Sequence, residues 1–141
     1  MSLLIFGFDI PQTAWFFYSD TERILATVLE REARRWFWPV SGQFNIFYRF
    51  GVHQPEYIPD FVVALDHMML MIETKKASEV IAAHESETEV KAKADQVVVW
   101  CKNATDYSNK VGGKLWRYLL IPHDAVAANV TLENLISRFG V

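Results

Sequence analysis

Two acidic residues and a lysine lie near the ends of two neighbouring hydrophobic segments. Asp60 begins one segment, within YIPDFVVAL, and Glu73 and Lys75 end the next, within MMLMIETKK. A carboxylate among apolar residues is costly to ionise, so two close together need a shared proton or a cation. Mg²⁺ is a hard cation that takes oxygen ligands of this kind. These residue types suggest a metal-assisted site, with Lys75 within reach of whatever the cation binds.

The two segments are predicted to form a β-hairpin that brings the three residues together. With the dipeptide Asp66-His67 as a two-residue turn, counting back along both strands places Asp60 opposite Glu73. Side chains alternate between faces along a strand, so Asp60, Glu73 and Lys75 share one face. The alternative to a metal-assisted site is that Asp60 and Glu73 lie at solvated strand ends, where Lys75 forms an ordinary surface ion pair that contributes little stability. The register predicts the pairs Leu65–Met68, Ala64–Met69 and Val62–Met71.

A helix precedes the hairpin and carries a third candidate acid. The segment SDTE, which starts at Ser19, has capping-box spacing, and the helix is predicted to run to about Trp36. Apolar residues recur along it at helical spacing and place Glu22 on the buried face. Two interpretations of Glu22 stay open. It is either the capping-box acid that bonds back to the Ser19 amide, or a third carboxylate directed at Asp60 and Glu73.

The remaining elements complete the predicted α/β fold. Because a helix connects the hairpin to the last strand, that strand should run parallel to its neighbour. The expected architecture is a single-domain mixed sheet flanked by helices, with an αβββαβ core in residues 19–122 and a C-terminal helix in 123–141. Pro59 should mark a bend or bulge just before Asp60. The other predicted elements are peripheral extended segments at 3–8 and 14–18, strands at 44–50 and 115–121, and helices at 85–108 and 131–139.

Composition narrows the class of protein. The chain has 141 residues, is 51% hydrophobic and carries a formal net charge of −3, so it is long enough for one well-packed domain. The acidic balance argues against strong autonomous binding to nucleic acid, because that affinity comes mostly from Lys and Arg on phosphates. Any DNA would then be delivered by another module. No apolar run reaches the length of a membrane span.

Other residues with possible chemistry give weaker signals. A single cysteine, Cys101, excludes an internal disulfide and fits a reducing compartment; its place on a helical apolar stripe predicts a buried thiol. The four histidines lack zinc-ligand spacing. Lys76, Lys91 and Lys93 are candidates for phosphate contacts, and the alternative is an ordinary solvated helix surface.

The motif and the predicted frame together resemble a known nuclease superfamily. Pro59-Asp60, followed by Glu73-Thr74-Lys75, resembles the PD-(D/E)XK pattern. More narrowly, residues 14–135 are similar to the C-terminal nuclease domain of type III restriction enzyme restriction subunits. The resemblance implies a mixed sheet flanked by helices and Mg²⁺-dependent cleavage of DNA phosphodiester bonds, with Mn²⁺ as a substitute. The segments that carry it are SDTER, GQFNIFYR, YIPDFVV, MLMIETK, VKAKADQVVVWC and GGKLWRYLLIP.

The resemblance also implies roles for individual residues. Asp60, Glu73 and Glu22 would hold the metal, Thr74 would add its backbone carbonyl, and Lys75 would orient the attacking water or stabilise charge on the phosphate. The implied partners are DNA, a helicase-like ATPase module and a methyltransferase subunit, in the cytoplasm of a prokaryote. The phosphate-loop pattern of such an ATPase is absent from this sequence. The alternatives are a catalytically inactive nuclease-fold module that binds DNA or a helicase, and a junction-cutting resolvase.

Overall fold

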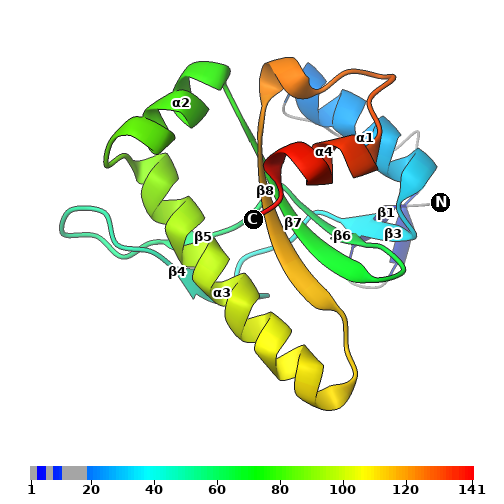
Figure 1. Cartoon of the computed structure of the whole chain (residues 1–141), viewed down its shortest axis with the longest axis horizontal. Coiled ribbons are helices and arrows are strands. Elements are labelled where there is room, and N and C mark those ends of the chain that lie inside the picture. The colour runs from blue at the N-terminus through cyan, green and yellow to red at the C-terminus, as the bar shows by residue number, and fades with distance from the viewer. Residues whose placement is uncertain (1–2, 6–7, 11–18) are drawn as a thin grey trace.

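A four-stranded mixed sheet forms the centre of the molecule (Figure 1). The structure is a computed structural model that describes residues 3–5, 8–10 and 19–141. The strand order is β3-β6-β7-β8, in which β7 is antiparallel to β6 and parallel to β8. The strands of this sheet are β3 (Arg35–Phe37), β6 (Phe61–Ala64), β7 (Met68–Lys75) and β8 (Leu115–Pro122).

Two small hairpins and four α-helices surround this sheet in the described part of the chain. The helices are α1 (Asp20–Glu32), α2 (Ala77–Glu85), α3 (Glu89–Val111) and α4 (Leu132–Phe139). The hairpins pair β1 (Leu3–Ile5) with β2 (Phe8–Ile10) and β4 (Ile46–Phe47) with β5 (Glu56–Tyr57). The predicted mixed sheet with flanking helices is confirmed, as is the parallel pairing of the last strand.

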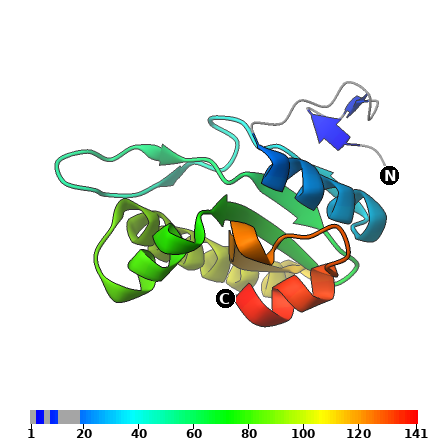
Figure 2. The same ribbon diagram turned by 90° about the horizontal axis from the view of Figure 1, so that it is seen from above.

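Each face of the sheet packs against its own hydrophobic cluster. On one face, Leu70 and Ile72 of β7 pack with buried residues of α1 and α4. On the other face, Met71 packs with Val97 and Cys101 of α3 and with the β4–β5 hairpin. This alternation along β7 is the predicted one, and the view in Figure 2 shows the sheet between the two layers. Cys101 is buried, as expected.

The hairpin between β6 and β7 has the predicted register. Ala64 pairs with Met69 and Val62 pairs with Met71, and the Leu65 amide donates to the Met68 carbonyl. The two-residue turn therefore fixes which side chains of β7 face each cluster.

The first helix is shorter than predicted. It begins as expected at the N-cap Ser19, whose hydroxyl accepts a hydrogen bond from the Glu22 amide, but it ends at Glu32. Trp36 lies in the edge strand β3 and is fully buried, with its ring against Phe61. The prediction of a helix to Trp36 was wrong because burial in the sheet outweighed the helical spacing of this residue.

The predicted strands on either side of residue 55 are also shorter. Of residues 44–50, only the two residues of β4 form a strand, and they lie outside the main sheet. The strand that was predicted to lead into the turn at residues 66–67 is interrupted between β5 and β6. Pro59 lies in this gap and has no N–H group to donate to a neighbouring strand. As a result the β4–β5 hairpin leaves the sheet as a separate arm.

The predicted helix at 85–108 corresponds to α3, which begins after the N-cap Thr88 and runs to Val111. The separate helix α2, over Ala77–Glu85, was not predicted. The short C-terminal helix is confirmed with its N-cap at Thr131. In the N-terminal region, β1 and β2 confirm an extended segment near 3–8, and the prediction for 14–18 falls outside the described residues.

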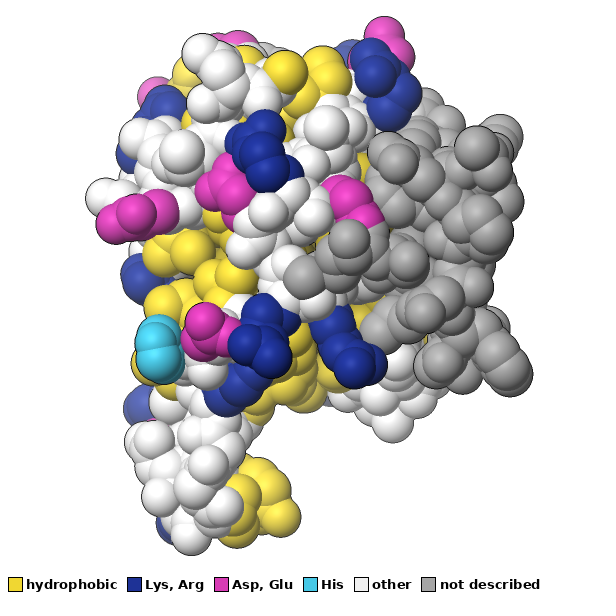
Figure 3. Space-filling view, turned by 90° about the vertical axis from the view of Figure 1, so that its right-hand side faces the viewer, with side chains coloured by type: hydrophobic (Ala, Val, Ile, Leu, Met, Phe, Trp, Pro, Cys, Tyr) yellow, Lys and Arg dark blue, Asp and Glu magenta, His cyan; other side chains and the backbone are white. Residues whose placement is uncertain are grey.

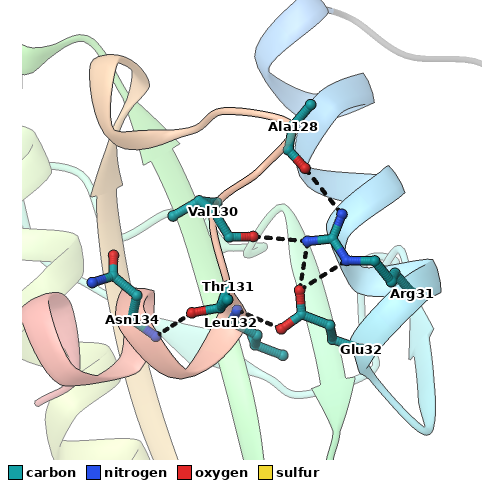
Figure 4. A network of polar contacts seen from close by, with 7 residues as sticks. All are labelled: Arg31, Glu32, Ala128, Val130, Thr131, Leu132 and Asn134. Atoms are coloured by element: carbon teal, nitrogen blue, oxygen red, sulfur yellow. Dashed lines mark hydrogen bonds and ion pairs between the residues drawn. The ribbon is translucent and has the colours of Figure 1, made fainter.

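A polar network joins α1 to the chain before α4 (Figure 4). The Arg31 guanidinium donates to the carbonyls of Ala128 and Val130, at 2.9 and 2.8 Å, and to the Glu32 carboxylate. Glu32 in turn accepts from the Leu132 amide at 2.9 Å. A carboxylate thus satisfies an otherwise unpaired amide in the first turn of α4, where the helix dipole favours negative charge.

In the stretches that the structure describes, every helix is too short or too polar to cross a lipid bilayer.

Candidate functional site

Glu73 is a buried carboxylate near the end of the central strand β7. The residue is only 7% exposed, and its side chain lies on the sheet face covered by α3. The Tyr57 hydroxyl donates a hydrogen bond to Glu73 Oε2 at 2.5 Å, and the Tyr118 hydroxyl lies 3.4 Å from that of Tyr57. Glu73 is therefore held at one oxygen by a buried tyrosine pair from β5 and β8.

Asp60 is the residue just before β6, which begins at Phe61. Because Phe61 pairs with Ile72, Asp60 lies beside the same end of β7 as Glu73. Its Oδ2 accepts hydrogen bonds from the Thr74 amide at 2.9 Å and from the Thr74 hydroxyl at 3.1 Å. The carboxylate takes the place of a ladder carbonyl where the neighbouring strand has turned away at Pro59. This bend before Asp60 was predicted from the proline.

Lys75 completes the group from the last residue of β7. Its Nζ lies 3.6 Å from Glu73 Oε1, and its side chain is 28% exposed. The structure thus brings together Asp60, Glu73, Thr74 and Lys75, which were predicted to lie close to one another.

The two carboxylates are electrostatically strained. Burial, followed by repulsion from Asp60, raises the pKa of Glu73 to about 8. Burial also raises the pKa of Asp60, although the hydrogen bonds from Thr74 and the charges of Lys75 and His123 oppose that shift. The pair therefore ionises fully only at alkaline pH or with added positive charge beside it.

Each carboxylate keeps one oxygen that no described residue hydrogen-bonds. These atoms are Asp60 Oδ1 and Glu73 Oε1, the latter contacting only the Lys75 ammonium at 3.6 Å. Every fully buried polar side-chain atom in the described ranges has a hydrogen-bond partner, so these two oxygens are reached by water. The free oxygens are the atoms that a cation would meet.

The structure does not bring Glu22 to this group. Glu22 is half-buried in the first turn of α1, and α1 packs on the sheet face opposite to the Glu73 side chain. Within residues 3–5, 8–10 and 19–141, no three Asp, Glu, His or Cys side chains come together as a metal site. A metal at this position would have two protein carboxylates, with the remaining positions left to backbone oxygen, water or substrate.

The three lysines predicted as phosphate contacts have different surroundings. Lys93 lies over the Tyr48 ring at 5.5 Å, and its charge lowers the pKa of Glu73, so it faces the site. Lys91 is bound to carboxylates of its own helix region, 2.6 Å from Asp95. Lys76 is the exposed N-cap position of α2.

Three site residues were not predicted from the sequence. Tyr57 and Tyr118 surround Glu73, and burial raises the pKa of both hydroxyls, so they act as neutral donors. His123 follows β8, and its charge lowers the pKa of Asp60. The parallel register of β7 with β8 is the signal that could have identified Tyr118 and His123 as site residues. It places Glu73 next to Leu120 and Lys75 next to Pro122, so the end of β8 that contains Tyr118 and leads to His123 lies beside the acidic end of β7.

The arrangement fits a hard divalent cation in its donor set. Two carboxylates with raised pKa values, each with an accessible oxygen, would both ionise more readily beside such an ion. Comparison of the chain with protein-family models, curated proteins and solved structures finds no match.

Proposed function

We propose that this domain is a Mg²⁺-dependent DNA endonuclease of the PD-(D/E)XK kind, as in type III restriction enzymes. The observation that carries the proposal is the grouping of Asp60, Glu73 and Lys75 at one end of β7, with a lysine nitrogen 3.6 Å from a buried carboxylate. The cytoplasm of a prokaryote is the compartment that this proposal implies. DNA delivery would fall to a helicase/ATPase module and a methyltransferase subunit.

Each residue has a role in this proposal. Asp60 and Glu73, with the Thr74 carbonyl, would hold Mg²⁺, and Mn²⁺ would substitute for it. When bound, such an ion polarises the scissile phosphate and lowers the pKa of a coordinated water. Lys75 would place its ammonium beside the phosphate and its attacking water. Tyr57 holds Glu73 by one oxygen and leaves the other toward Lys75.

Thermal melting with and without metal tests the cation site directly. Mg²⁺ or Mn²⁺ at about 100 times its dissociation constant stabilises the fold by about 2.7 kcal/mol. For a chain of this size, that raises the melting midpoint by roughly 5–10 °C. The measurement belongs at pH 8.5, because Glu73 must lose its proton before it binds a metal. Asp60→Asn should lose most of the increase.

Cleavage of plasmid DNA tests the activity. Glu73→Ala and Lys75→Ala should each abolish Mg²⁺-dependent nicking, whereas Lys102→Ala, an exposed change on α3, should leave it intact. Unchanged nicking in both site variants would reject the assignment. Branched substrates cut in preference to linear ones would favour a resolvase.

A non-catalytic module with the same fold is the second candidate. It is favoured by two findings: the described residues bring only two carboxylates to the site, and Glu22 lies on a helix that covers the opposite face of the sheet. This candidate predicts no cleavage with any divalent ion and no metal-induced rise in melting temperature.

A further inference from the structure

Lys93 of α3 is a basic residue at the candidate site to which the proposed function gives no role. Burial raises the pKa of Glu73, and the charge of Lys93 opposes that rise, so this ammonium group lies near the buried carboxylate. Lys75 of β7 reaches the same carboxylate at 3.6 Å. Two ammonium groups thus approach Glu73, one from the strand and one from the helix that covers it.

The surroundings of Lys93 differ from those of Lys91, the nearest lysine along the chain. Residues two positions apart on an α-helix are rotated by about 200° around its axis, so the two side chains leave α3 on different sides. Lys91 lies 2.6 Å from Asp95 and 3.5 Å from Glu87, its neighbours four positions ahead and behind. Its charge is therefore already neutralised by carboxylates.

Lys93 has no carboxylate at ion-pair distance in the described part of the chain. Four positions behind it is Glu89, a spacing at which an acid commonly pairs with a lysine. Glu89 instead accepts a hydrogen bond from the hydroxyl of the buried Tyr48 at 2.7 Å, and Lys93 Nζ lies 5.5 Å from the centre of the Tyr48 ring. Tyr48 thus occupies the acid and holds the lysine by its ring.

Lys93 is half-buried, which makes a charge without a carboxylate partner costly. Partial enclosure removes water from the ammonium group, and the contact with an aromatic ring offsets only part of that loss. By contrast, on the face shown in Figure 3 basic side chains lie beside acidic ones, and Arg34 pairs with Asp66 at 2.8 Å. An anion bound at the site would complete the surroundings of Lys93.

From these contacts we infer that Lys93 binds a phosphate of the DNA strand at the candidate site, and that Tyr48 positions it for this contact. The Lys93 ammonium would donate to a non-bridging phosphate oxygen, as lysines do at other phosphate sites. This role rests on the proposed nuclease function, which supplies the phosphodiester. Lys75 contacts Glu73 directly and Lys93 does not, so we assign Lys75 to the chemical step and Lys93 to substrate binding.

Fluorescence anisotropy of a labelled 24-base-pair duplex tests this contact without metal, at pH 7 in EDTA over a range of salt concentrations. Lys93→Met removes the charge and keeps an unbranched side chain over the Tyr48 ring. It should weaken binding roughly three- to tenfold and reduce the slope of log K against log salt by about 1. Lys93→Arg should restore the affinity and the slope, because a guanidinium also donates to phosphate.

Lys91→Met is the matched control. It removes the same formal charge from the same helix, but from an ammonium group that Asp95 and Glu87 already neutralise. It should change the affinity by less than about twofold and leave the salt slope unchanged. Thermal melting shows whether each variant is folded, and a role for Lys93 confined to packing on Tyr48 would lower the melting temperature of Lys93→Met without changing its slope.

Cleavage kinetics with Mg²⁺ distinguish the two lysines. Lys93→Met should raise KM roughly three- to tenfold and change kcat by less than about twofold, because it removes binding that the substrate and the transition state share. Lys75→Met should instead lower kcat, because its contact is made at the reacting phosphate.

Three outcomes would overturn the role of Lys93. One is the absence of duplex binding by the unmodified protein. Another is the same salt slope in Lys93→Met as in Lys91→Met. The third is competition by poly-glutamate that equals competition by unlabelled duplex of the same charge, which would make Lys93 a contact for anions in general.

Failure of the proposed nuclease would look different. Duplex binding that depends on Lys93, without cleavage in Mg²⁺ or Mn²⁺, would reject the nuclease and retain Lys93 as a phosphate contact. Cleavage by Lys93→Met with the KM and the salt slope of the unmodified protein would reject the role of Lys93 alone.

Discussion

Replacement of Glu73 by Gln should stabilise the protein at alkaline pH and change little at acidic pH. The amide keeps the shape of the side chain and an oxygen that accepts from Tyr57, but it carries no charge. In the folded protein the pKa of Glu73 rises from 4.5 to about 8 because of burial and repulsion from Asp60. Each pKa unit corresponds to about 1.4 kcal/mol, so the ionised carboxylate destabilises the fold by at most about 5 kcal/mol.

The direction of the pH effect follows from proton binding. Between about pH 4.5 and pH 8 the folded state retains the Glu73 proton while the unfolded state has released it. Stability contributed by this group is therefore fully present below pH 4.5 and falls as the pH rises to about 8. Above that range, the loss is complete and constant.

Urea denaturation at pH 5, 7 and 9 measures this difference. The free energy of unfolding of Glu73→Gln should exceed that of the unmodified protein by about 3–5 kcal/mol at pH 9 and by less than about 1 kcal/mol at pH 5. Glu85→Gln, an exposed change on α2, is the matched control and should show no such divergence. Parallel pH profiles for Glu73→Gln and the unmodified protein would refute the assignment of a strained carboxylate.

Three further results are expected. Glu32→Ala removes the acceptor of the Leu132 amide, so it should lower the free energy of unfolding by about 1–3 kcal/mol in urea titrations; an unchanged midpoint would contradict the network in Figure 4. Gly140→Ala should destabilise by about 1–3 kcal/mol, because a Cβ would lie 2.6 Å from the Ile136 carbonyl oxygen, and calorimetry showing no loss would dispute that contact. Burial raises the pKa of Cys101 to about 12, so a disulfide reagent at pH 8 should modify this thiol only after denaturation. Rapid modification of the native protein would disprove its burial.

The parts of the fold that the sequence predicted correctly are those controlled by local chemistry. The turn at residues 66–67 sets the hairpin register, and the apolar alternation along Met68–Lys75 determines both faces of β7. Ser19 caps α1 as its spacing indicates. The group of Asp60, Glu73 and Lys75 was predictable because it depends on that register.

Tertiary packing decided the features that were missed. Trp36 suits either a helical stripe or a buried edge strand, and its packing on Phe61 selects the strand. Tyr57 and Tyr118 read as ordinary core aromatics until β5 and β8 are placed on either side of Glu73. The position of Glu22 depends on which face of the sheet α1 covers, which periodicity within a helix does not specify.

The parallel pairing of β7 with β8 also determines when the candidate site can form during synthesis. Glu73 leaves the ribosome well before its neighbour Tyr118, and both α2 and α3 are made in between. Until β8 emerges, the acidic end of β7 lacks one side of its enclosure and stays hydrated. Contacts so distant in sequence close slowly, so a nascent chain would acquire its hairpin first and its buried carboxylate only after β8 has been synthesised.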